Sequence, residues 1–326
     1  MKRVVLIVLA ALLLCGAVAC GSALERTKDG TLRIVTTIFP IRDWTVNVLG
    51  DRADAADVRL LVDNGVDLHS FQPTVADVAA IADCDLFVYI GGESDRWVSD
   101  ALEKMPNPDR VALNLMDALG EAAREEESVE GMQTEEEPED AALDEHIWLS
   151  LQNAETLCAA IRDALITLDP AHAASYRAGC AAYSEQLAAL DAAYRRTVES
   201  APVRTLLFAD RFPFRYLTED YGLSYYAAFS GCSAETEASF ETIAFLAKKA
   251  DELGLKAILK IETSDGRIAE TVAQNTAARD QKILTLDSMQ SVTAADMENG
   301  ETYLAVMERN LAVLGEALQQ EDTWHI

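Results

Sequence analysis

Two histidines have the residue type and the setting for metal coordination. His69 lies in the segment Val-Asp-Leu-His-Ser-Phe-Gln-Pro and His146 in Asp-Glu-His-Ile-Trp-Leu-Ser, each beside acidic residues at the end of an apolar run. Neutral imidazole is the commonest protein ligand for zinc and related ions, and loops between rigid elements let ligands converge from distant parts of a chain. The two segments therefore predict a site for a divalent transition metal.

Three carboxylates are candidates to complete such a site. Asp210, Glu262 and Asp287 each follow directly after a short β-rich run. Ligands of open α/β sheets bind beyond the carboxyl ends of the strands, so we expect these side chains along one rim. Imidazole nitrogen together with carboxylate oxygen makes a mixed site that suits a divalent metal.

The segments that must position these groups alternate between β-rich and helical patterns. Strand, helix and strand in that order indicate parallel sheets covered by helices. We expect strands within residues 33–40, 57–62, 85–90, 205–209, 257–261 and 282–286. We expect helices over residues 43–49, 75–82, 240–253, 268–276 and 303–318.

A long helix is expected between the two halves. Tyr183, Leu187, Leu190 and Tyr194 recur at spacings of four, three and four, which places them in one apolar stripe on a helix. From Pro170 in its first turn, roughly thirty residues give a length of about 45 Å. The fold class is therefore α/β, with two lobes, each a mainly parallel sheet with flanking helices, joined by one long helix. The predicted divisions are a signal segment (1–20), a first lobe (21–165), the linking helix (166–200) and a second lobe (201–326).

The first residues predict export and a lipid anchor. A basic start is followed by an apolar run over residues 4–14 and then by Ala-Val-Ala-Cys-Gly, which resembles a bacterial lipobox with Cys20 as the lipidated residue. Cys15 is a weaker rival for lipidation, and an ordinary secreted protein is the alternative. We expect an extracytoplasmic protein, anchored to the lipid bilayer on the outer face or the periplasmic side of the cell membrane.

The charge balance excludes one class of partner. The formal net charge is −28, which argues against nucleic acid and suits a protein that concentrates cations. Twelve acids and one base lie between Glu121 and Glu145, and this segment lacks apolar periodicity. It is interpreted as a mobile, solvated loop, and a solubilising insertion is favoured over weak cation capture.

The four cysteines outside the signal segment, Cys84, Cys158, Cys180 and Cys232, show no Cys-x-x-Cys spacing. The absence of this spacing excludes a zinc ribbon and a thioredoxin-like motif. Cys158 and Cys180 lie in Ala-rich helical sequence and are interpreted as small buried hydrophobic residues. One structural disulfide remains open, without an assignment.

The ordered set of motifs resembles a known family. Residues 66–74, 145–150, the long helix over 169–198 and the closing Leu-Asp-Ser over 286–288 look like the zinc/manganese substrate-binding lipoproteins of bacterial ABC importers, the cluster A-I solute-binding proteins. The resemblance implies two lobes joined by one helix, with a single metal ion between them. Carried over position by position, it implies His69, His146 and Asp287 as ligands.

One position departs from the family pattern. Arg211 stands where the resemblance implies a histidine or glutamate ligand, and a protonated guanidinium does not bind a cation. Either Asp210 takes over as the ligand, or Glu262 reaches in, or Arg211 forms a salt bridge with a carboxylate and the coordination is altered. Asp210 is the preferred choice. A carboxylate in place of imidazole hardens the site and shifts the expected metal from zinc toward manganese, so both metals are kept.

The resulting hypothesis is a tethered, monomeric receptor rather than an enzyme. It captures one zinc or manganese ion and delivers it to an ABC permease and, through it, to the ATPase. A secreted metallohydrolase is the alternative, with Glu145 or Glu262 as general base, although neither His-Glu-x-x-His nor Gly-x-Ser-x-Gly occurs. A surface adhesin or interaction protein on the same fold is the third interpretation.

Overall fold

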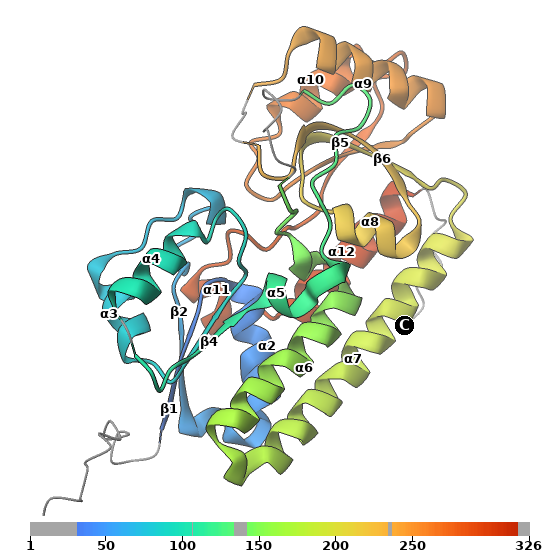
Figure 1. Ribbon diagram of the computed structural model, residues 1–326. Helices are drawn as coiled ribbons and strands as arrows, with labels where there is room; N and C mark the ends of the chain where they lie inside the picture. The colour runs from blue at the N-terminus through green and yellow to red at the C-terminus, as the bar shows by residue number, and fades with distance from the viewer. Residues whose placement is uncertain (1–30, 106, 134–141, 234–236, 319–326) are drawn as a thin grey trace, which may run out of the picture. The chain divides into compact units, whose positions relative to one another are not determined.

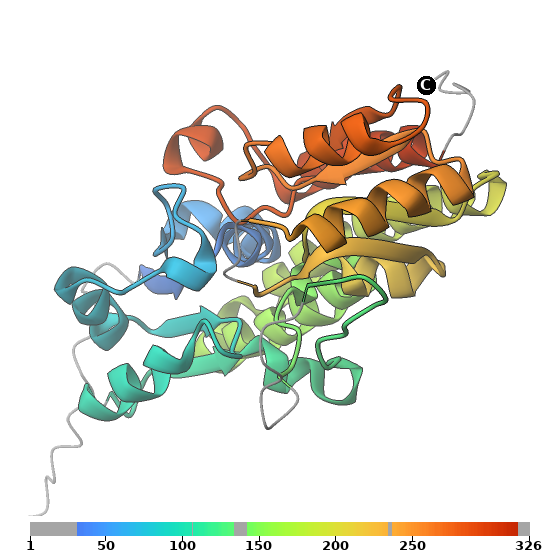
Figure 2. The same cartoon turned by 90° about the horizontal axis from the view of Figure 1, so that it is seen from above.

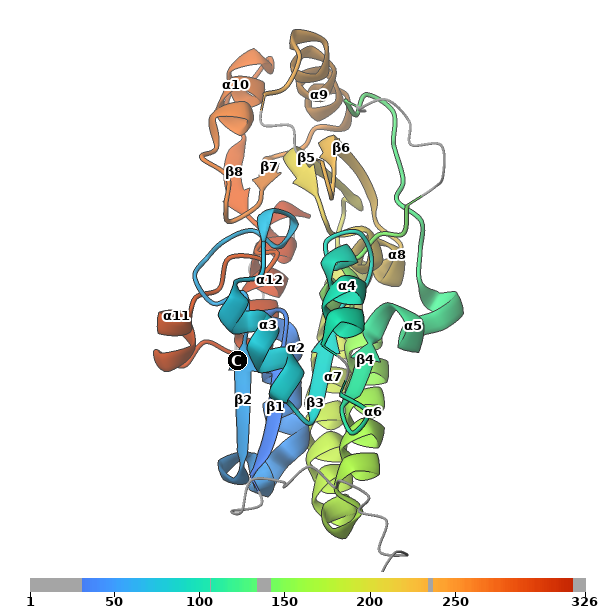
Figure 3. The ribbon, with the colours of Figure 1, turned by 60° about the vertical axis from the view of Figure 1, so that its left-hand side comes forward.

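Parallel strands form two four-stranded sheets in the part of the chain that the computed structural model describes, residues 31–105, 107–133, 142–233 and 237–318 (Figures 1 and 3). All described elements belong to one compact unit that begins at Leu32. The first sheet has the order β2-β1-β3-β4, with β1 (Leu32–Thr36), β2 (Ala56–Leu60), β3 (Leu86–Tyr89) and β4 (Val111–Asn114). The second has the order β6-β5-β7-β8, with β5 (Thr205–Phe212), β6 (Ser224–Ser230), β7 (Ala257–Lys260) and β8 (Lys282–Thr285).

Helices flank both sheets, as the α/β prediction requires. The α-helices are α2 (Phe39–Leu49), α3 (Val75–Asp83), α4 (Arg96–Lys104), α5 (Leu115–Leu119), α6 (Leu151–Leu168), α7 (Ala173–Ser200), α8 (Arg215–Tyr221), α9 (Phe240–Leu253), α10 (Arg267–Asn275), α11 (Ala294–Glu298) and α12 (Tyr303–Ala317). Short 3-10 helices are η1 (Gly50–Ala55), η2 (Leu68–Ser70), η3 (Gly120–Ala122), η4 (Ile147–Leu149) and η5 (Pro170–His172). Helices α9 and α10 pack together on one face of the second sheet (Figures 1 and 2). Helix α12 packs against β7 and β8. None of the described helices combines the length and the apolar character needed to cross a bilayer.

Helix α7 confirms the predicted long helix. Its 28 residues correspond to about 42 Å, and the four residues of the predicted apolar stripe are all buried. Tyr183 donates a hydrogen bond to Asp43 of α2 at 3.1 Å, and Tyr194 donates to the carbonyl of Met307 in α12 at 2.6 Å. A side chain at Gly179 would lie 2.6 Å from the carbonyl oxygen of Val48, so this glycine permits close contact between α7 and α2. The helix therefore connects elements that flank both sheets.

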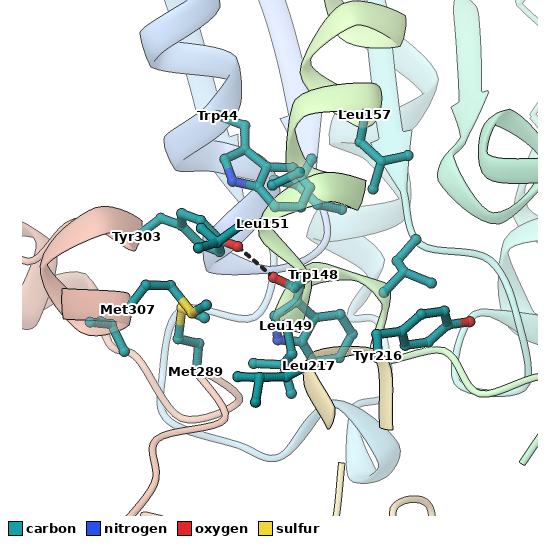
Figure 4. Close-up of a cluster of buried hydrophobic side chains, with 14 of the residues drawn as sticks. Trp44, Trp148, Leu149, Leu151, Leu157, Tyr216, Leu217, Met289, Tyr303 and Met307 are labelled. Carbon is teal, nitrogen blue, oxygen red and sulfur yellow. Dashed lines mark hydrogen bonds between the residues drawn. The ribbon is translucent and has the colours of Figure 1, made fainter. Parts of the chain in front are cut away.

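A continuous hydrophobic core runs from the first sheet to part of the second, and it contains aromatic residues from several helices. Trp44 and Trp148 are fully buried and are among the largest side chains of this core. Tyr303 donates a hydrogen bond to the carbonyl of Trp148 at 2.7 Å and packs edge-on against Trp44 (Figure 4). Trp148 also donates from its indole nitrogen to the carbonyl of Ser288 at 2.9 Å. The segment that carries His146 is therefore held in place by the packing and hydrogen bonds of Trp148 in this core.

Several predicted element boundaries were wrong. Strands β4 and β6 were not predicted, and each is an edge strand of its sheet. Strand β5 continues past the predicted end through an irregularity in its pairing with β6 between Phe208 and Arg211, so Asp210 lies within a strand. Glu262 and Asp287 do follow the ends of β7 and β8. The signal segment with Cys15 and Cys20 lies outside the described residues.

The acidic segment was predicted to be a mobile, solvated loop, and its described part, residues 121–133, is a largely exposed loop that also makes specific contacts with the second half of the chain. The backbone N–H of Gln133 donates to the carbonyl of Ala228 at 2.8 Å, which adds a bridge to β6. Arg124 pairs with Glu219 at 2.9 Å, and Lys249 lies 3.6 Å from Glu130. Backbone pairing and scattered cations therefore hold residues 121–133 against the second sheet, an arrangement that side-chain periodicity does not reveal. Residues 134–141 lie outside the described chain.

Candidate metal centre

His69 lies in a short turn that follows strand β2 of the first sheet. It lies in η2, between β2 and α3, and Asp67 caps this turn by accepting the backbone N–H of His69 at 3.0 Å. Helix α3 then begins with a capping box between Thr74 and Asp77. Both ends of the loop are therefore fixed by side-chain caps, which limits the freedom of the imidazole between them.

His146 is placed by the segment that leads into α6. Its side chain is fully buried and stands at the N-cap of η4. Asp144 accepts the backbone N–H of His146 at 2.9 Å and pairs with its ring Nδ1 at 2.8 Å. The ring lies 5.1 Å from that of Trp148, centroid to centroid, so the core described above supports it directly.

The two imidazoles face each other through their Nε2 nitrogens. Nε2 of His69 lies 3.3 Å from Nε2 of His146. Each Nδ1 pairs with a carboxylate, Glu145 at 2.9 Å for His69 and Asp144 at 2.8 Å for His146. A carboxylate on Nδ1 holds the proton there and leaves the Nε2 lone pair for a metal.

The distance between the two nitrogens fits a shared ion. Two nitrogens bound to a tetrahedral zinc at about 2.0–2.1 Å lie about 3.3 Å from each other. The Nε2 to Nε2 distance of 3.3 Å matches this value. Two lone pairs at this distance repel unless a proton or a metal cation lies between them, so the pair is arranged for chelation.

A third donor lies beside the histidines, and it was missed from the sequence. Ligand atoms of His69, His146 and Cys232 all lie within 4.8 Å of one another. Cys232 follows β6, and its backbone N–H donates to Glu126 at 3.1 Å. Its position depends on an edge strand that the sequence pattern did not reveal. The four described cysteines are free thiols, and Cys158 and Cys180 are buried in the core as predicted.

Gly231 lets the Cys232 loop approach the buried imidazole. A Cβ at this position would lie 2.9 Å from Cε1 of His146 and 3.0 Å from the carbonyl oxygen of Phe212. Neither neighbour has room to move, because the ring is buried and the carbonyl belongs to β5. Glycine is therefore required here by the space available.

The three predicted carboxylates accept hydrogen bonds from backbone groups. Asp210 accepts the N–H groups of Arg211 at 2.8 Å and Ile261 at 3.3 Å. Glu262 accepts that of Ser288 at 2.7 Å, and Asp287 accepts that of Met289 at 2.8 Å. Among the described residues, the group of ligand atoms formed by the two histidines and Cys232 includes none of these carboxylates. The structure thus brings together His69 and His146 but does not place Asp210, Glu262 or Asp287 in their ligand group.

Arg211 forms a salt bridge with a carboxylate, which is one of the three arrangements considered from the sequence. Its Nη2 lies 2.6 Å from Oδ2 of Asp67, and both side chains are largely shielded from solvent. Burial alone raises the pKa of Asp67, but the hydrogen bond and charge of Arg211 outweigh burial and lower it. The carboxylate stays ionised and also caps the His69 turn.

Burial and neighbouring charges shift the pKa values of the ionisable groups around the pair. Burial opposes ionisation of Glu145, yet hydrogen bonds from His69 and Ser94 lower its pKa below the ordinary value. Burial opposes protonation of His146, yet the charge of Asp144 raises its pKa. Burial, followed by the charges of Glu126 and Glu145, raises the pKa of the Cys232 thiol. The surroundings are thus negatively charged and favour a cation.

The sequence is similar to those of proteins named for zinc binding and zinc uptake. Residues 34–317 match the ZnuA family, described as zinc-uptake complex component A, periplasmic. The chain is 32% identical over 326 residues to the zinc-binding lipoprotein AdcA of Streptococcus pneumoniae, covering 98% of this chain and 62% of AdcA. It is 29% identical over 304 residues to the high-affinity zinc uptake system protein ZnuA of Bacillus subtilis, covering 92% of this chain and 93% of that protein.

A solved structure agrees with the sequence relatives. The crystal structure of the Zn(II)-bound ZnuA-like domain of Streptococcus pneumoniae AdcA superimposes with a TM-score of 0.71 at 30% identity, covering 89% of this chain and all of that domain. The chain spans only 62% of the length of the pneumococcal AdcA relative, so that relative has further sequence beyond the shared part.

Proposed function

Because the chain belongs to the ZnuA family of periplasmic zinc-uptake components, we propose that it captures a divalent transition metal, zinc in the first place, and delivers it to an ABC permease. The observation that carries this proposal is the pair of Nε2 atoms 3.3 Å apart, with each Nδ1 held by a carboxylate. Two imidazole nitrogens at this distance can bind one tetrahedral ion. The metal is cargo, so the site needs affinity and a route to release rather than a reaction.

The choice of zinc over manganese rests on donor chemistry. Imidazole suits zinc, whereas manganese prefers carboxylate, carbonyl and water oxygens. The three carboxylates predicted from the sequence lie outside the ligand group of the two histidines and Cys232, which argues against their use as hard oxygen donors here. The names of the relatives AdcA and ZnuA, both described as zinc proteins, support the same choice.

Delivery follows from where the donors are attached. His69 follows a strand of the first sheet and His146 precedes α6, so relative movement of these segments changes the distance between the two nitrogens. A permease that displaces the His69 loop would separate the nitrogens and release the ion. Helix α7 is bonded to elements beside both sheets, which favours a local displacement over a wide opening.

The proposed location is outside the cytoplasm, with Cys20 as the lipid anchor. The family is periplasmic by description, and the pneumococcal relative is named a lipoprotein. A diacyl anchor would hold a monomeric receptor at the membrane surface, where the permease and its ATPase lie.

The direct test is to titrate the metal-stripped protein with zinc and to measure binding by calorimetry and stability by thermal unfolding. Zinc should stabilise the fold by about 2.7 kcal/mol at a hundredfold excess over Kd, and manganese should do so more weakly. His69→Ala and His146→Ala should each lower zinc affinity by more than about 100-fold, because even the loss of a group bonded to a ligand costs about 10–100-fold.

His172 offers a matched control for these substitutions. It pairs with Asp169 at 2.7 Å in η5, at the start of the long helix and outside the ligand group. His172→Ala should leave zinc affinity unchanged. Wild-type affinity in both His69→Ala and His146→Ala would overturn the proposed function.

A further inference from the structure

We infer that Cys232 supplies a thiolate as the third protein ligand, which makes the site a two-nitrogen, one-sulfur centre selective for zinc and similarly soft cations. This inference rests on the proposed function and refines it. The first support is geometric: one ligand atom from each of His69, His146 and Cys232 lies within 4.8 Å of the others. The three donors come from the loop after β2, the segment before η4 and the loop after β6. Donors from three separate segments are typical of a built site.

The surroundings of Cys232 distinguish it from the other cysteines. Cys84, Cys158 and Cys180 belong to hydrophobic clusters, where a thiol acts as a small apolar side chain. Cys232 belongs to none of the described clusters, and its sulfur lies 3.8 Å from Oε1 of Glu145. A thiol among carboxylates and imidazoles gains little from hydrophobic burial. Its position is better explained by coordination.

The loop that carries Cys232 is held against the histidine pair from two directions. Gly231 lies so close to the ring of His146 that a Cβ would approach Cε1 to 2.9 Å. Glu126 accepts the backbone N–H of Cys232 at 3.1 Å. These contacts fix the backbone that leads into the Cα of Cys232, and rotation of the side chain then adjusts the distance from the sulfur to an ion.

Arg211 removes a competing arrangement. The position that the sequence resemblance assigned to a ligand holds a guanidinium, and this guanidinium is engaged with Asp67 at 2.6 Å. Two imidazoles alone hold zinc weakly, since structural and catalytic zinc sites use at least three protein donors. Cys232 supplies the missing donor from the loop that follows the neighbouring strand β6, and one tetrahedral position remains for a water molecule or a further oxygen ligand.

The donor set determines the class of ion. Thiolate and imidazole donors favour zinc over manganese, which is the opposite of the shift that a third carboxylate would cause. As the sulfur–zinc bond forms, the Cys232 thiol releases its proton to solvent, and no oxidant or reductant takes part. Cadmium and cobalt(II) are therefore expected to bind as well, and cobalt(II) provides a spectroscopic probe.

Cobalt(II) absorption tests the inference on the full chain. The cobalt-loaded protein should show the near-ultraviolet charge-transfer band of a thiolate–cobalt bond, and Cys232→Ser should abolish this band while weak cobalt binding through the histidines persists. Cys232→Ser should also lower zinc affinity by more than about tenfold and narrow the preference for zinc over manganese. Cys84→Ala is the matched control and should retain the band, with circular dichroism confirming that each variant folds.

The outcomes separate this inference from the proposed function. If zinc binds and depends on His69 and His146, but the band is absent or survives in Cys232→Ser, the thiolate ligand is refuted and the receptor function stands. If Asp287→Asn rather than Cys232→Ser lowers affinity, a carboxylate is the third ligand and the inference is again refuted. If neither zinc nor cobalt binds the wild-type protein, the proposed function itself fails.

Discussion

Arg211 of β5 donates a hydrogen bond to Oδ2 of Asp67 at 2.6 Å, while Oδ1 of the same carboxylate accepts the backbone N–H of His69 at 3.0 Å. One carboxylate thus connects the second sheet to the turn that carries a candidate ligand. A residue that cannot bind a cation therefore has a role in the site, because it fixes the carboxylate that positions His69.

Removing this link should loosen the His69 turn. Arg211→Met keeps the bulk of the side chain but leaves the Asp67 carboxylate without its cation, and we expect zinc affinity to fall by about tenfold. Titration calorimetry at two salt concentrations measures the effect. Arg279→Met, at an exposed position away from the site, is the control. Unchanged affinity in Arg211→Met would show that the His69 turn is held by its local cap alone.

The close approach at Gly231 gives a second prediction. Gly231→Ala places a methyl group 2.9 Å from Cε1 of His146, so it should displace the ring or the Cys232 loop and weaken zinc binding. Gly222→Ala is a suitable control because it meets no atom within 4 Å but has a φ of +64°. The control should lose about 1 kcal/mol of stability without a change in zinc affinity, since only the backbone conformation is strained. Equal zinc affinity in both variants would contradict the packing argument.

The carboxylates behind the imidazoles give a third prediction. Asp144→Asn and Glu145→Gln keep the shape of each side chain but remove the charge that holds the proton on Nδ1. Each should lower zinc affinity by about 10–100-fold without unfolding the protein. Competition with a zinc-binding dye provides the measurement, and Glu185→Gln, an exposed position on α7, is the control. If Asp144→Asn and Glu145→Gln lose no more zinc affinity than Glu185→Gln does, the histidine tautomers are set by other contacts.

The buried carboxyl of Asp43 predicts how stability depends on pH. Burial raises its pKa from 3.8 to about 6, against the opposing hydrogen bond from Tyr183. The folded state therefore binds this proton more tightly than the unfolded state, and stability falls as pH rises from about 4 to 6. Above that range the ionised group costs up to about 3 kcal/mol.

Asp43→Asn tests this dependence. Denaturant unfolding of the metal-free protein should show the variant more stable than wild type at pH 7, with the difference vanishing near pH 4. Asparagine still offers an oxygen to Tyr183, so the packing is retained. A variant that is less stable than wild type at pH 7 would show that the carboxylate hydrogen bonds outweigh the burial of charge.

The sequence predicted those features that repeat along the chain or depend on neighbouring residues. The stripe from Tyr183 to Tyr194 predicted α7 because a helical period is local information, and alternation of strands and helices predicted both parallel sheets. The His69 and His146 segments were recognisable because each combines a histidine with acidic neighbours, and the structure places their nitrogens 3.3 Å apart.

What the sequence did not predict depends on contacts between distant segments. Strand β6 is an edge strand without a clear alternating pattern, so the loop that carries Cys232 had no predicted position. Asp210 was expected beyond a strand because the run of apolar residues ends there, whereas β5 continues to Phe212 through pairing with β6. The contacts of Glu126 and Glu130 were not predicted, because their partners lie in the second half of the chain.

The bridge between Gln133 and Phe229 has a consequence for self-association. Strand β6 is the outer strand of its sheet, and an outer strand with free backbone groups is a template on which another chain adds by strand pairing. The described part of the acidic segment occupies some of these groups and surrounds them with like charges that repel a second copy. This cover would keep neighbouring copies of the chain from joining edge to edge.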